Sequence, residues 1–359
     1  MPAYLISLEW SNGPLAFLKA IITVGLPHPV SNIMAALVCY YILLLSFGVR
    51  PYLAIAGALA FGFSSYMIIG LGAGHNTRIG AIALVPLTIA GIHLAFSGKR
   101  YIGSALTAAG LALQLRENHL QITYYLMFIV AGYALVQAIY AIREKELKSF
   151  LHTSLLLAAA VILAAATFAG PFWVVNEYSQ YSMRGKSVLA HTGGQAKDGL
   201  NKDYVFEYSN GLTEPLTLLV PNILGGSTSK SFLYDENSHI SKEFGNTYQE
   251  ILKSGDYQTA NQLIGATTGY FGMQGNTAPY YAGAIICCAF AIGIAFAKRK
   301  YLWWLLPLCI LSVMLTYGAN LKWFNYFMFD YMPGYNKFRS VTFALMIILF
   351  AMPLLGMLG

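Results

Sequence analysis

Residues 79–97 read "IGAIALVPLTIAGIHLAFS", a stretch of 19 residues without Asp, Glu, Lys or Arg. A helix needs roughly 20 apolar residues to cross the hydrocarbon core of a bilayer, so this stretch predicts a membrane-spanning helix. It begins directly after "GHNTR" (74–78) and ends at "GKR" (98–100). The polar groups at its two ends therefore indicate how the helix is oriented, and other segments of the chain repeat this arrangement.

The composition of the whole chain agrees with a lipid environment. Hydrophobic residues make up 57% of the 359 residues, charged residues only 10%, and the mean hydropathy is +0.56. A soluble domain has roughly 25% charged residues, which it needs to cover its surface. The net charge of +7 is therefore interpreted as a marker of membrane topology, and no nucleic-acid partner is expected.

Apolar stretches near spanning length recur along the chain and predict about nine membrane-spanning helices. They lie at about 30–48, 52–73, 79–97, 101–116, 120–142, 150–175, 280–297, 301–317 and 341–358. The predicted fold class is thus an all-α polytopic membrane protein. Its expected regions are an N-terminal bundle with outer loops (1–175), a hydrophilic extracytoplasmic loop region (176–279) and C-terminal helices (280–359). Within the loop region, "NTYQEILKSGDYQTANQLI" (246–264) predicts a short helix.

Basic residues orient the predicted spans. They gather in alternate connections, at Arg50, Lys99–Arg100, "REKELK" (143–148) and "KRK" (298–300). Connections rich in Lys and Arg stay in the cytoplasm, so the intervening connections face outward, including "GHNTR", "RENHLQ" (116–121) and the loop 176–279. The predicted location is a membrane, which the chain crosses several times, with the long loop on the extracytoplasmic side. Residues 1–29 would lie outside without a preceding span, which leads us to expect a piece of a longer protein.

The "GHNTR" motif places His75, Asn76 and Arg78 at the outer end of a span. Imidazole, amide and guanidinium groups suit a phosphate or a sugar hydroxyl. The alternative is a polar turn at the membrane interface from which Arg78 extends to the lipid headgroups.

The "RENHLQ" motif interrupts a second hairpin in the same way. It contains Arg116, Glu117, Asn118, His119 and Gln121. Ionisable groups at membrane depth are costly and usually face a cavity or a partner. The two motifs together predict a polar cavity open to the outside. In the alternative interpretation, Glu117 forms a structural ion pair with Arg116 or Arg78.

Charged residues of the long loop and of the last connection are further candidates. Glu177, Glu207 and Glu214 offer carboxylates that could act as a general base, and Arg184 could hold a phosphate. Scattered charges are equally typical of a solvated loop. In "DYMPGYNKFRS" (330–340), positive charge is disfavoured outside, which singles out Lys337 and Arg339 as anion ligands.

Motifs of other enzyme classes do not occur in the sequence. There is no Walker A motif, no GxSxG and no HExxH. The cysteines lie within apolar stretches, where they act as small hydrophobic residues; they are Cys39, Cys287, Cys288 and Cys309. No metal site is predicted, and the cofactor is left unassigned, with a divalent cation still open.

Several stretches resemble the YfhO-like bacterial membrane proteins. They are "MPAYLIS" (1–7), "FSSYMIIGLGAGHNTR" (63–78), "LRENHLQITYYL" (115–126), "NEYSQYSMRG" (176–185), "YSNGLTEPLTLLVPNILGG" (208–226), "GYFGMQGNTAPYYAGA" (269–284) and "YNKFR" (335–339). The resemblance implies a location in the bacterial inner membrane and a GT-C-type glycosyltransferase fold that uses polyprenyl-phosphate sugars. It also implies a carboxylate in the first outer loop as base or metal ligand, where this chain has only Glu9. By this resemblance, the chain lacks an N-terminal span and a C-terminal part, and is expected to be an inactive fragment if these are required.

The leading hypothesis is a membrane glycosyltransferase that moves a sugar from a polyprenyl-phosphate donor to a glycan, lipid or polymer acceptor. The predicted catalytic carboxylates are Glu207, Glu214, Glu117 and Glu9. The predicted substrate-binding residues are His75, Asn76, Arg78, Arg116, Asn118, His119, Gln121, Arg184, Tyr208, Gln274, Lys337 and Arg339. The alternative is a transporter or flippase for a lipid-linked or anionic solute, although such proteins place their sites near the midplane and often contain inverted repeats. A non-catalytic scaffold, which would lack the polar cavity, is a third hypothesis.

Overall fold

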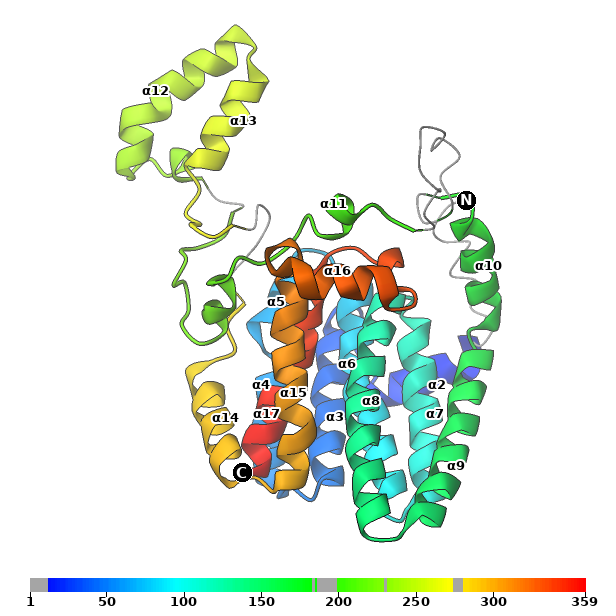
Figure 1. The fold of residues 1–359 in the computed structure, drawn as a ribbon. Coiled ribbons are helices and arrows are strands. Elements are labelled where there is room, and N and C mark those ends of the chain that lie inside the picture. Colours follow the sequence, from blue (N-terminus) through cyan, green and yellow to red (C-terminus); the bar gives the residue numbers. More distant parts are fainter. Residues whose placement is uncertain (1–11, 183–184, 186–198, 229–230, 274–279) are drawn as a thin grey trace.

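The computed structural model describes residues 12–182, 185, 199–228, 231–273 and 280–359. Within these ranges the chain is helical, and its only strand-like pairings are two isolated bridges, Gly225 with Tyr270 and Ser231 with Thr268. The helices form a bundle with an irregular region and a helical hairpin at one end (Figure 1). The predicted all-α class is therefore confirmed.

Five segments are long and apolar enough to cross a membrane. They are Pro51–Gly72, α6 (Asn76–Phe96), α8 (Leu120–Arg143), α9 (Leu147–Ala166) and Val341–Leu358, which comprises η5 (Val341–Ala344) and α17 (Leu345–Leu358). Each overlaps one of the predicted spans, but the span predicted at 150–175 ends at Ala166, and the remaining residues of that stretch belong to a break and to α10 (Ala169–Ser179). The first of them is divided at Phe63 and Ser64 into α4 (Pro51–Gly62) and α5 (Ser65–Gly72). The apolar helices of the bundle suggest association with a lipid bilayer.

The other predicted spans are shorter or bent. The helices α3 (Val30–Ser46) and α7 (Arg100–Arg116) have 17 residues each, and α14 (Ala284–Phe296) has 13. The helix α15 (Arg299–Thr316) turns by 110° into η3 (Gly318–Leu321) and α16 (Lys322–Tyr331). Counting α15 and this continuation as one span gives six spans, so the predicted total of nine stays a prediction.

The close contact between α6 and α7 depends on glycines. A Cβ atom added to Gly91, Gly103 or Gly110 would meet backbone atoms of the opposite helix. Small residues let the backbones of membrane helices approach and gain van der Waals contact along their length. The helix α6 is buried on nearly all sides. The pair of α6 and α7 therefore forms the centre of the bundle, and the polar motifs "GHNTR" and "RENHLQ" lie at one end of this pair.

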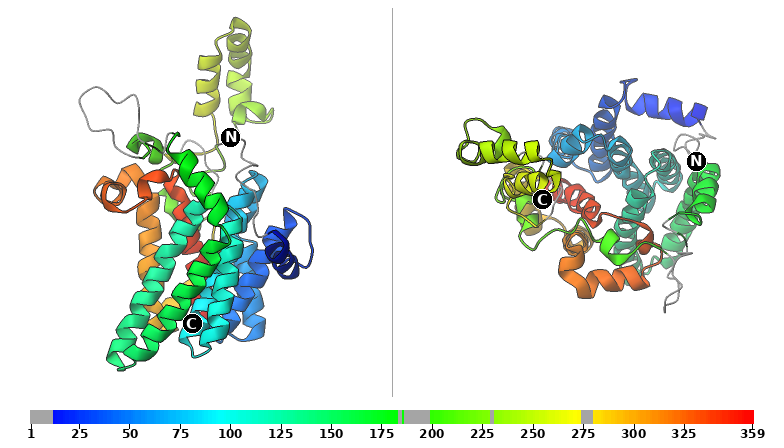
Figure 2. Two further views of the ribbon diagram at one scale, coloured as in Figure 1. Left: turned by 90° about the vertical axis from the view of Figure 1, so that its right-hand side faces the viewer. Right: turned by 90° about the horizontal axis from the view of Figure 1, so that it is seen from above.

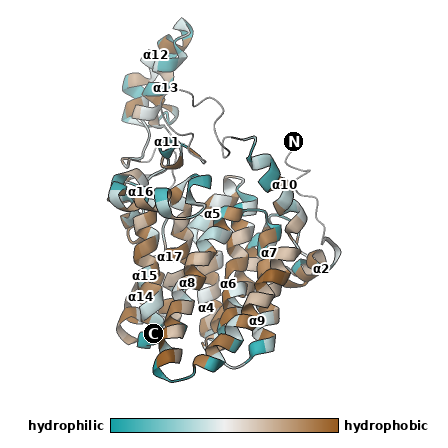
Figure 3. Ribbon diagram, turned by 45° about the vertical axis from the view of Figure 1, so that its right-hand side comes forward, coloured by the Kyte–Doolittle hydropathy of each residue, from teal (hydrophilic) through white to brown (hydrophobic). Residues whose placement is uncertain are grey.

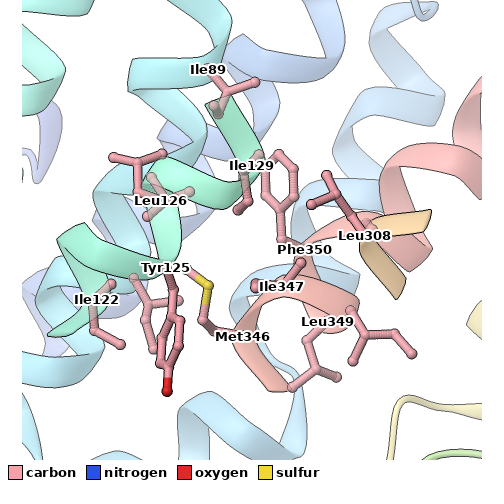
Figure 4. Packing of buried hydrophobic residues seen from close by; sticks show 14 of the residues in the cluster. Ile89, Ile122, Tyr125, Leu126, Ile129, Leu308, Met346, Ile347, Leu349 and Phe350 are labelled. Carbon is pink, nitrogen blue, oxygen red and sulfur yellow. The ribbon is translucent and has the colours of Figure 1, made fainter. Parts of the chain in front are cut away.

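A second part of the core lies between α8, α15 and α17. Figure 4 shows Tyr125 and Ile129 of α8 facing Met346 and Phe350 of α17. The helix α3 joins this core through Tyr40, whose hydroxyl donates a 2.6 Å hydrogen bond to the carbonyl oxygen of Phe350. This packing fixes the start of α17 beside the outer end of α8.

The basic connections gather at one end of the bundle. Arg100 donates a 2.6 Å hydrogen bond to Ser149, and the ammonium of Lys300 lies 5.0 Å from the ring centroid of Tyr140. Three of the connections that the sequence marked as basic therefore lie together. The turns α8–α9 and α14–α15 are at the lower end in Figure 1, opposite the outer region.

We call the end of the bundle opposite the basic connections, with the irregular segments beyond it, the outer region. It carries most of the polar surface (Figure 3). It contains α10 (Ala169–Ser179), α11 (Lys202–Val205), η1 (Glu214–Leu218), η2 (Phe232–Tyr234), α16 and η4 (Tyr335–Lys337). The hairpin of α12 (His239–Ser254) and α13 (Tyr257–Ala266) projects beyond it (Figure 2). The single helix predicted over 246–264 is thus wrong: Gly255, with φ +78°, ends α12 in the left-handed conformation, and Asp256 caps α13.

Candidate functional site

The two polar motifs meet at the ring of Phe343 in η5. The guanidinium carbon of Arg78, at the start of α6, lies 4.3 Å from the ring centroid of Phe343. The imidazole of His119, just before α8, has its centroid 5.9 Å from the same ring. Three distant parts of the chain therefore converge at the outer end of the bundle. We call Arg78, His75, His119, Tyr66, Tyr280 and Phe343 the arginine cluster.

Arg78 is the buried cation of this cluster. Only 4% of the residue is exposed, and its Nε atom is buried without a hydrogen-bond partner. Its guanidinium also lies 5.5 Å from the ring centroid of Tyr66 and is hydrogen-bonded with Tyr280. The alternative interpretation of this motif required Arg78 to extend to the lipid headgroups. Its burial shows that it does not. Aromatic faces stabilise a desolvated guanidinium without neutralising its charge.

Two histidines border Arg78. Burial, followed by the charge of Arg78, lowers the pKa of His119 to about 4. The same two causes, in the same order, lower the pKa of His75. Near neutral pH both imidazoles are therefore uncharged. The Nδ1 atom of His119 is buried and has no hydrogen-bond partner.

His75 and His119 also occupy the N-cap positions of α6 and α8, and neither side chain makes a capping hydrogen bond. The first-turn N–H groups of both helices therefore receive no hydrogen bond acceptor from the N-cap side chains. The positive ends of two helix dipoles then lie near a buried guanidinium, and each feature favours an anion. The predicted phosphate-binding residues His75, Arg78 and His119 are brought together by the fold.

Asn76 belongs to the other side of the first turn of α6. The Nδ2 group of Asn32, on α3, donates a 3.1 Å hydrogen bond to the carbonyl oxygen of Asn76. This bond fixes the orientation of the Asn32 amide, because only Nδ2 can donate. The Oδ1 atoms of both asparagines are buried and have no donor, and Asn32 is 1% exposed.

Glu117 forms an ion pair with Lys19 of α2 (Asn12–Ile22). The sequence had offered Arg116 or Arg78 as its structural partner and had missed Lys19. The carboxylate of Glu117 also lies over Gly80, where a Cβ atom would collide with it and would approach Oδ1 of Asn32 to 3.2 Å. Gly80 therefore lets a carboxylate reach the side of α6, next to an amide oxygen without a donor.

The remaining residues of "RENHLQ" shape the turn between α7 and α8. Arg116 is the half-buried last residue of α7, and Asn118 takes a left-handed conformation with φ +54°. Gln121 donates hydrogen bonds to the hydroxyl of Tyr125 at 3.2 Å and to the carbonyl of Ser340 at 3.3 Å. Gln121 thus connects α8 to the segment that leads into Phe343.

Arg339 forms a second cluster, in the outer region. It donates to Glu207 at 2.6 Å, to the hydroxyl of Tyr204 at 2.8 Å and to the hydroxyl of Tyr208 at 2.9 Å. Its guanidinium carbon lies 4.2 Å and 4.8 Å from the ring centroids of Tyr204 and Tyr208. The predicted residues Glu207, Tyr208 and Arg339 therefore come together, but they bind one another. Lys337 ends η4 nearby in the chain.

Glu214 is buried in the outer region, and both its oxygens accept hydrogen bonds. One accepts from the N–H of Gly211 and the other from the hydroxyl of Tyr270. Burial, followed by the hydrogen bond to Glu214, raises the pKa of Tyr270, so that the phenol keeps its proton. These bonds join the segment after α11 to the segment after α13.

Three predicted site residues, Glu9, Arg184 and Gln274, lie outside the described residues. Glu177 is exposed on α10. Sequence reasoning missed Lys19, Asn32, Tyr66 and Phe343, which complete the surroundings of Arg78 and Glu117. The isolated Asn32 in an apolar stretch was the one signal available, since ionisable or amide groups at membrane depth have a cost.

Across the described ranges, no group of three or more His, Cys, Asp or Glu side chains is arranged to hold a metal ion. Comparison of the chain with protein-family models, with curated proteins and with solved structures gives no match.

Proposed function

We propose that this protein is a polytopic glycosyltransferase of the bacterial inner membrane. It would transfer a sugar from a polyprenyl-phosphate donor to a glycan, lipid or polymer hydroxyl on the extracytoplasmic side. The observation that carries the proposal is the buried guanidinium of Arg78, which no carboxylate of the described residues pairs with. A second support is the resemblance of both polar motifs to YfhO-like proteins of the GT-C type.

A buried cation without an anionic partner is unfavourable by several kcal/mol. The arginine cluster supplies aromatic rings and neutral imidazoles, which leave the positive charge in place. An anion that enters the cluster would remove this penalty and would also accept hydrogen bonds from the first turns of α6 and α8. The phosphate of a lipid-linked sugar is such an anion, and its polyprenyl chain would stay in the bilayer.

The transfer step requires a base as well as a phosphate site. The oxygen of the acceptor hydroxyl attacks the anomeric carbon, the bond from that carbon to the phosphate oxygen breaks, and polyprenyl phosphate leaves. The acceptor proton passes to a carboxylate, while Arg78 stabilises the charge on the departing phosphate. Glu207 is bound to Arg339 and Glu214 has both oxygens occupied. Glu117 is also paired, with Lys19, but it lies two residues before His119 of the arginine cluster, and Glu9 lies outside the described residues. We therefore assign the base to Glu117, whose ion pair must open before the carboxylate accepts the proton.

The test is transfer from a polyprenyl-phosphate sugar by the purified protein in nanodiscs. Replacing Arg78 by Ala should lower kcat/KM by about 100-fold or more, the usual effect of removing one preorganised electrostatic contact. Arg50→Ala is the matched control, because Arg50 is exposed at the opposite end of the bundle and, among the residues that the structure describes, its guanidinium donates a hydrogen bond only to Tyr52. Unchanged transfer in both Arg78→Ala and Arg116→Ala would refute the proposed donor site.

A transporter or flippase for a lipid-linked or anionic solute is the second candidate function. It is favoured by a further polar contact near the basic end of the same central helix. His93 of α6 is hydrogen-bonded to the hydroxyl of Tyr133 at 2.8 Å and to Ser97 at 3.3 Å, and it stacks on Phe47. A flux assay in liposomes separates the two functions, since transport without sugar transfer would support the transporter.

A further inference from the structure

The helix α2 lies across the side of the bundle, transverse to α3 and α7 (Figures 1 and 2). It has 11 residues, too few to cross a membrane. Its inner face packs on a small apolar core of α3, α6 and α7. The contacts join Leu15, Leu18 and Ile22 to Cys39, Leu84, Leu87 and Leu113.

The partners of α2 set its depth. Leu84 and Leu87 come 8 and 11 residues after Asn76, the first residue of α6. At a rise of 1.5 Å per residue they lie about 12 Å and 17 Å along the helix from its outer end. The helix α2 is thus packed against the membrane-spanning part of α6, below the level of the polar motifs.

The outer face of α2 is apolar. On this helix Phe17 is 69% exposed and Ile21 is also exposed, and Val24, in the turn that follows the helix, continues the apolar surface. Lys19 is the only charged residue in this helix, and its side chain is turned inward onto Glu117. At the depth of the spans, an exposed apolar face contacts the acyl chains of lipids. A charge on this helix is tolerated there because Glu117 neutralises it.

The ion pair between Lys19 and Glu117 therefore lies between the lipid-facing surface of α2 and the face of α6 that contains Gly80. Behind it lie Gly80 and the unpaired amide oxygen of Asn32. Residues 78 and 80 are about 200° apart around the axis of α6, so Arg78 and the Lys19–Glu117 pair lie on opposite faces of the same helix end, and a phosphate passes from one to the other around the first turn of α6. A lysine ammonium can exchange a carboxylate for a phosphate, since both are oxygen anions that accept its hydrogen bonds.

We infer that α2 forms the lateral opening through which a lipid-linked phosphate reaches the site, with Lys19 as the first ligand of that phosphate. The polyprenyl chain lies along Phe17 and Ile21 in the bilayer, and the phosphate replaces Glu117 on Lys19. The exchange leaves the Glu117 carboxylate free to accept a proton. This inference rests on the proposed function and adds a binding residue, a route and a coupling between donor binding and the base.

The route is tested by photo-crosslinking in nanodiscs with radiolabelled polyprenyl phosphate. The photoreactive residue p-benzoylphenylalanine replaces Phe17 in one variant and Leu155 in the control. Leu155 lies on α9 and is 71% exposed, so it samples lipid to a similar extent. We expect labelling at position 17 that excess unlabelled polyprenyl phosphate removes, and that phosphatidylglycerol or inorganic phosphate does not remove. Equal labelling at both positions would reflect bulk lipid and would overturn the route.

The role of Lys19 is tested by kinetics. Lys19→Met should raise the KM for the donor about tenfold, as expected for the loss of one charge-assisted hydrogen bond. The kcat should change much less than the KM, because in the proposed step Lys19 acts on donor binding while Arg78 stabilises the departing phosphate. A fall in kcat with an unchanged KM would overturn the ligand role. In the exchange variant, Lys19→Glu with Glu117→Lys, the ion pair is rebuilt but the base is lost, so the melting temperature should recover and transfer should not.

The two proposals fail in different ways. Polyprenyl phosphate binding that requires Arg78 but does not label position 17 would leave the proposed function standing and would refute the lateral opening. Absence of any binding that depends on Arg78 would refute the proposed function, and the inference about α2 with it.

Discussion

The guanidinium of Arg78 and the ring of Phe343 lie 4.3 Å apart and join the first polar motif to the start of the last helix. Phe343 follows a short segment in which Arg339 contacts Tyr204 and the carbonyl of Ser340 accepts from Gln121. The outer region and the arginine cluster are therefore connected through residues 339–343. Ser340, with φ +64°, makes the turn that directs Phe343 toward Arg78.

Phe343→Leu tests this contact. Leucine fills a similar volume but lacks the negative face of the aromatic ring, so the variant should lose about 1 kcal/mol of stabilisation of the guanidinium. We expect a lower melting temperature in detergent and weaker binding of polyprenyl phosphate. Phe343→Tyr keeps the ring and serves as the control. Equal effects of the two substitutions would show that ring electrostatics play no part.

The lowered pKa of His119 predicts a pH dependence of stability. The folded protein favours the neutral imidazole, whose pKa falls from about 6.5 to about 4. This contribution is fully present above pH 6.5 and decreases as the pH falls toward 4. The measurement is the melting temperature between pH 7.5 and 4.5, in which His119→Gln should remove part of the slope. Identical slopes in both proteins would contradict the assignment.

Gly80→Ala should disturb the ion pair of Glu117. A Cβ atom at this position collides with the carboxylate, which must move away from Lys19. Overpacking of this kind costs about 1–3 kcal/mol, and it should lower the melting temperature. Gly72→Ala is the control, because a Cβ there meets nothing within 4 Å. A melting temperature unchanged in Gly80→Ala would mean that the carboxylate is not held against α6.

The pair of Glu207 and Arg339 should contribute little free energy of its own. Glu207 is 49% exposed at its side chain, and solvent screens the 2.6 Å contact. A double-mutant cycle with Glu207→Gln and Arg339→Met, in which each substitution removes one charge of the pair, should give a coupling below about 1 kcal/mol. Replacing Arg339 by Ala should destabilise more, because the guanidinium also loses Tyr204 and Tyr208. A coupling of several kcal/mol would indicate a desolvated pair.

The helical class and the positions of five spans could be predicted from the sequence because long apolar stretches have one dominant solution in a bilayer. The bend after α15 and the division at Phe63 were not predictable, since local tertiary contacts decide such breaks. The sequence shows a glycine at position 255 within 246–264. It does not show that Gly255 takes the left-handed conformation that divides this stretch into two helices.

The site was predictable only in part, for a similar reason. The positions of His75, Arg78 and His119 followed from charged groups at the ends of apolar stretches. Their partners did not, because Phe343 and Tyr66 are ordinary residues of apolar helices until the fold places them against Arg78. Lys19 lies almost a hundred residues before Glu117, and no local pattern marks that pairing.

The glycines at positions 91, 103 and 110 have a mechanical consequence. Because the backbones of α6 and α7 are in direct contact at these glycines, we expect the two helices to move together as one rigid unit. A change of shape in the bundle is then expected in the parts that pack against α6 and α7, which are α2 and residues 339–343. The rigid contact between α6 and α7 thus confines conformational change to the segments at the periphery of the bundle.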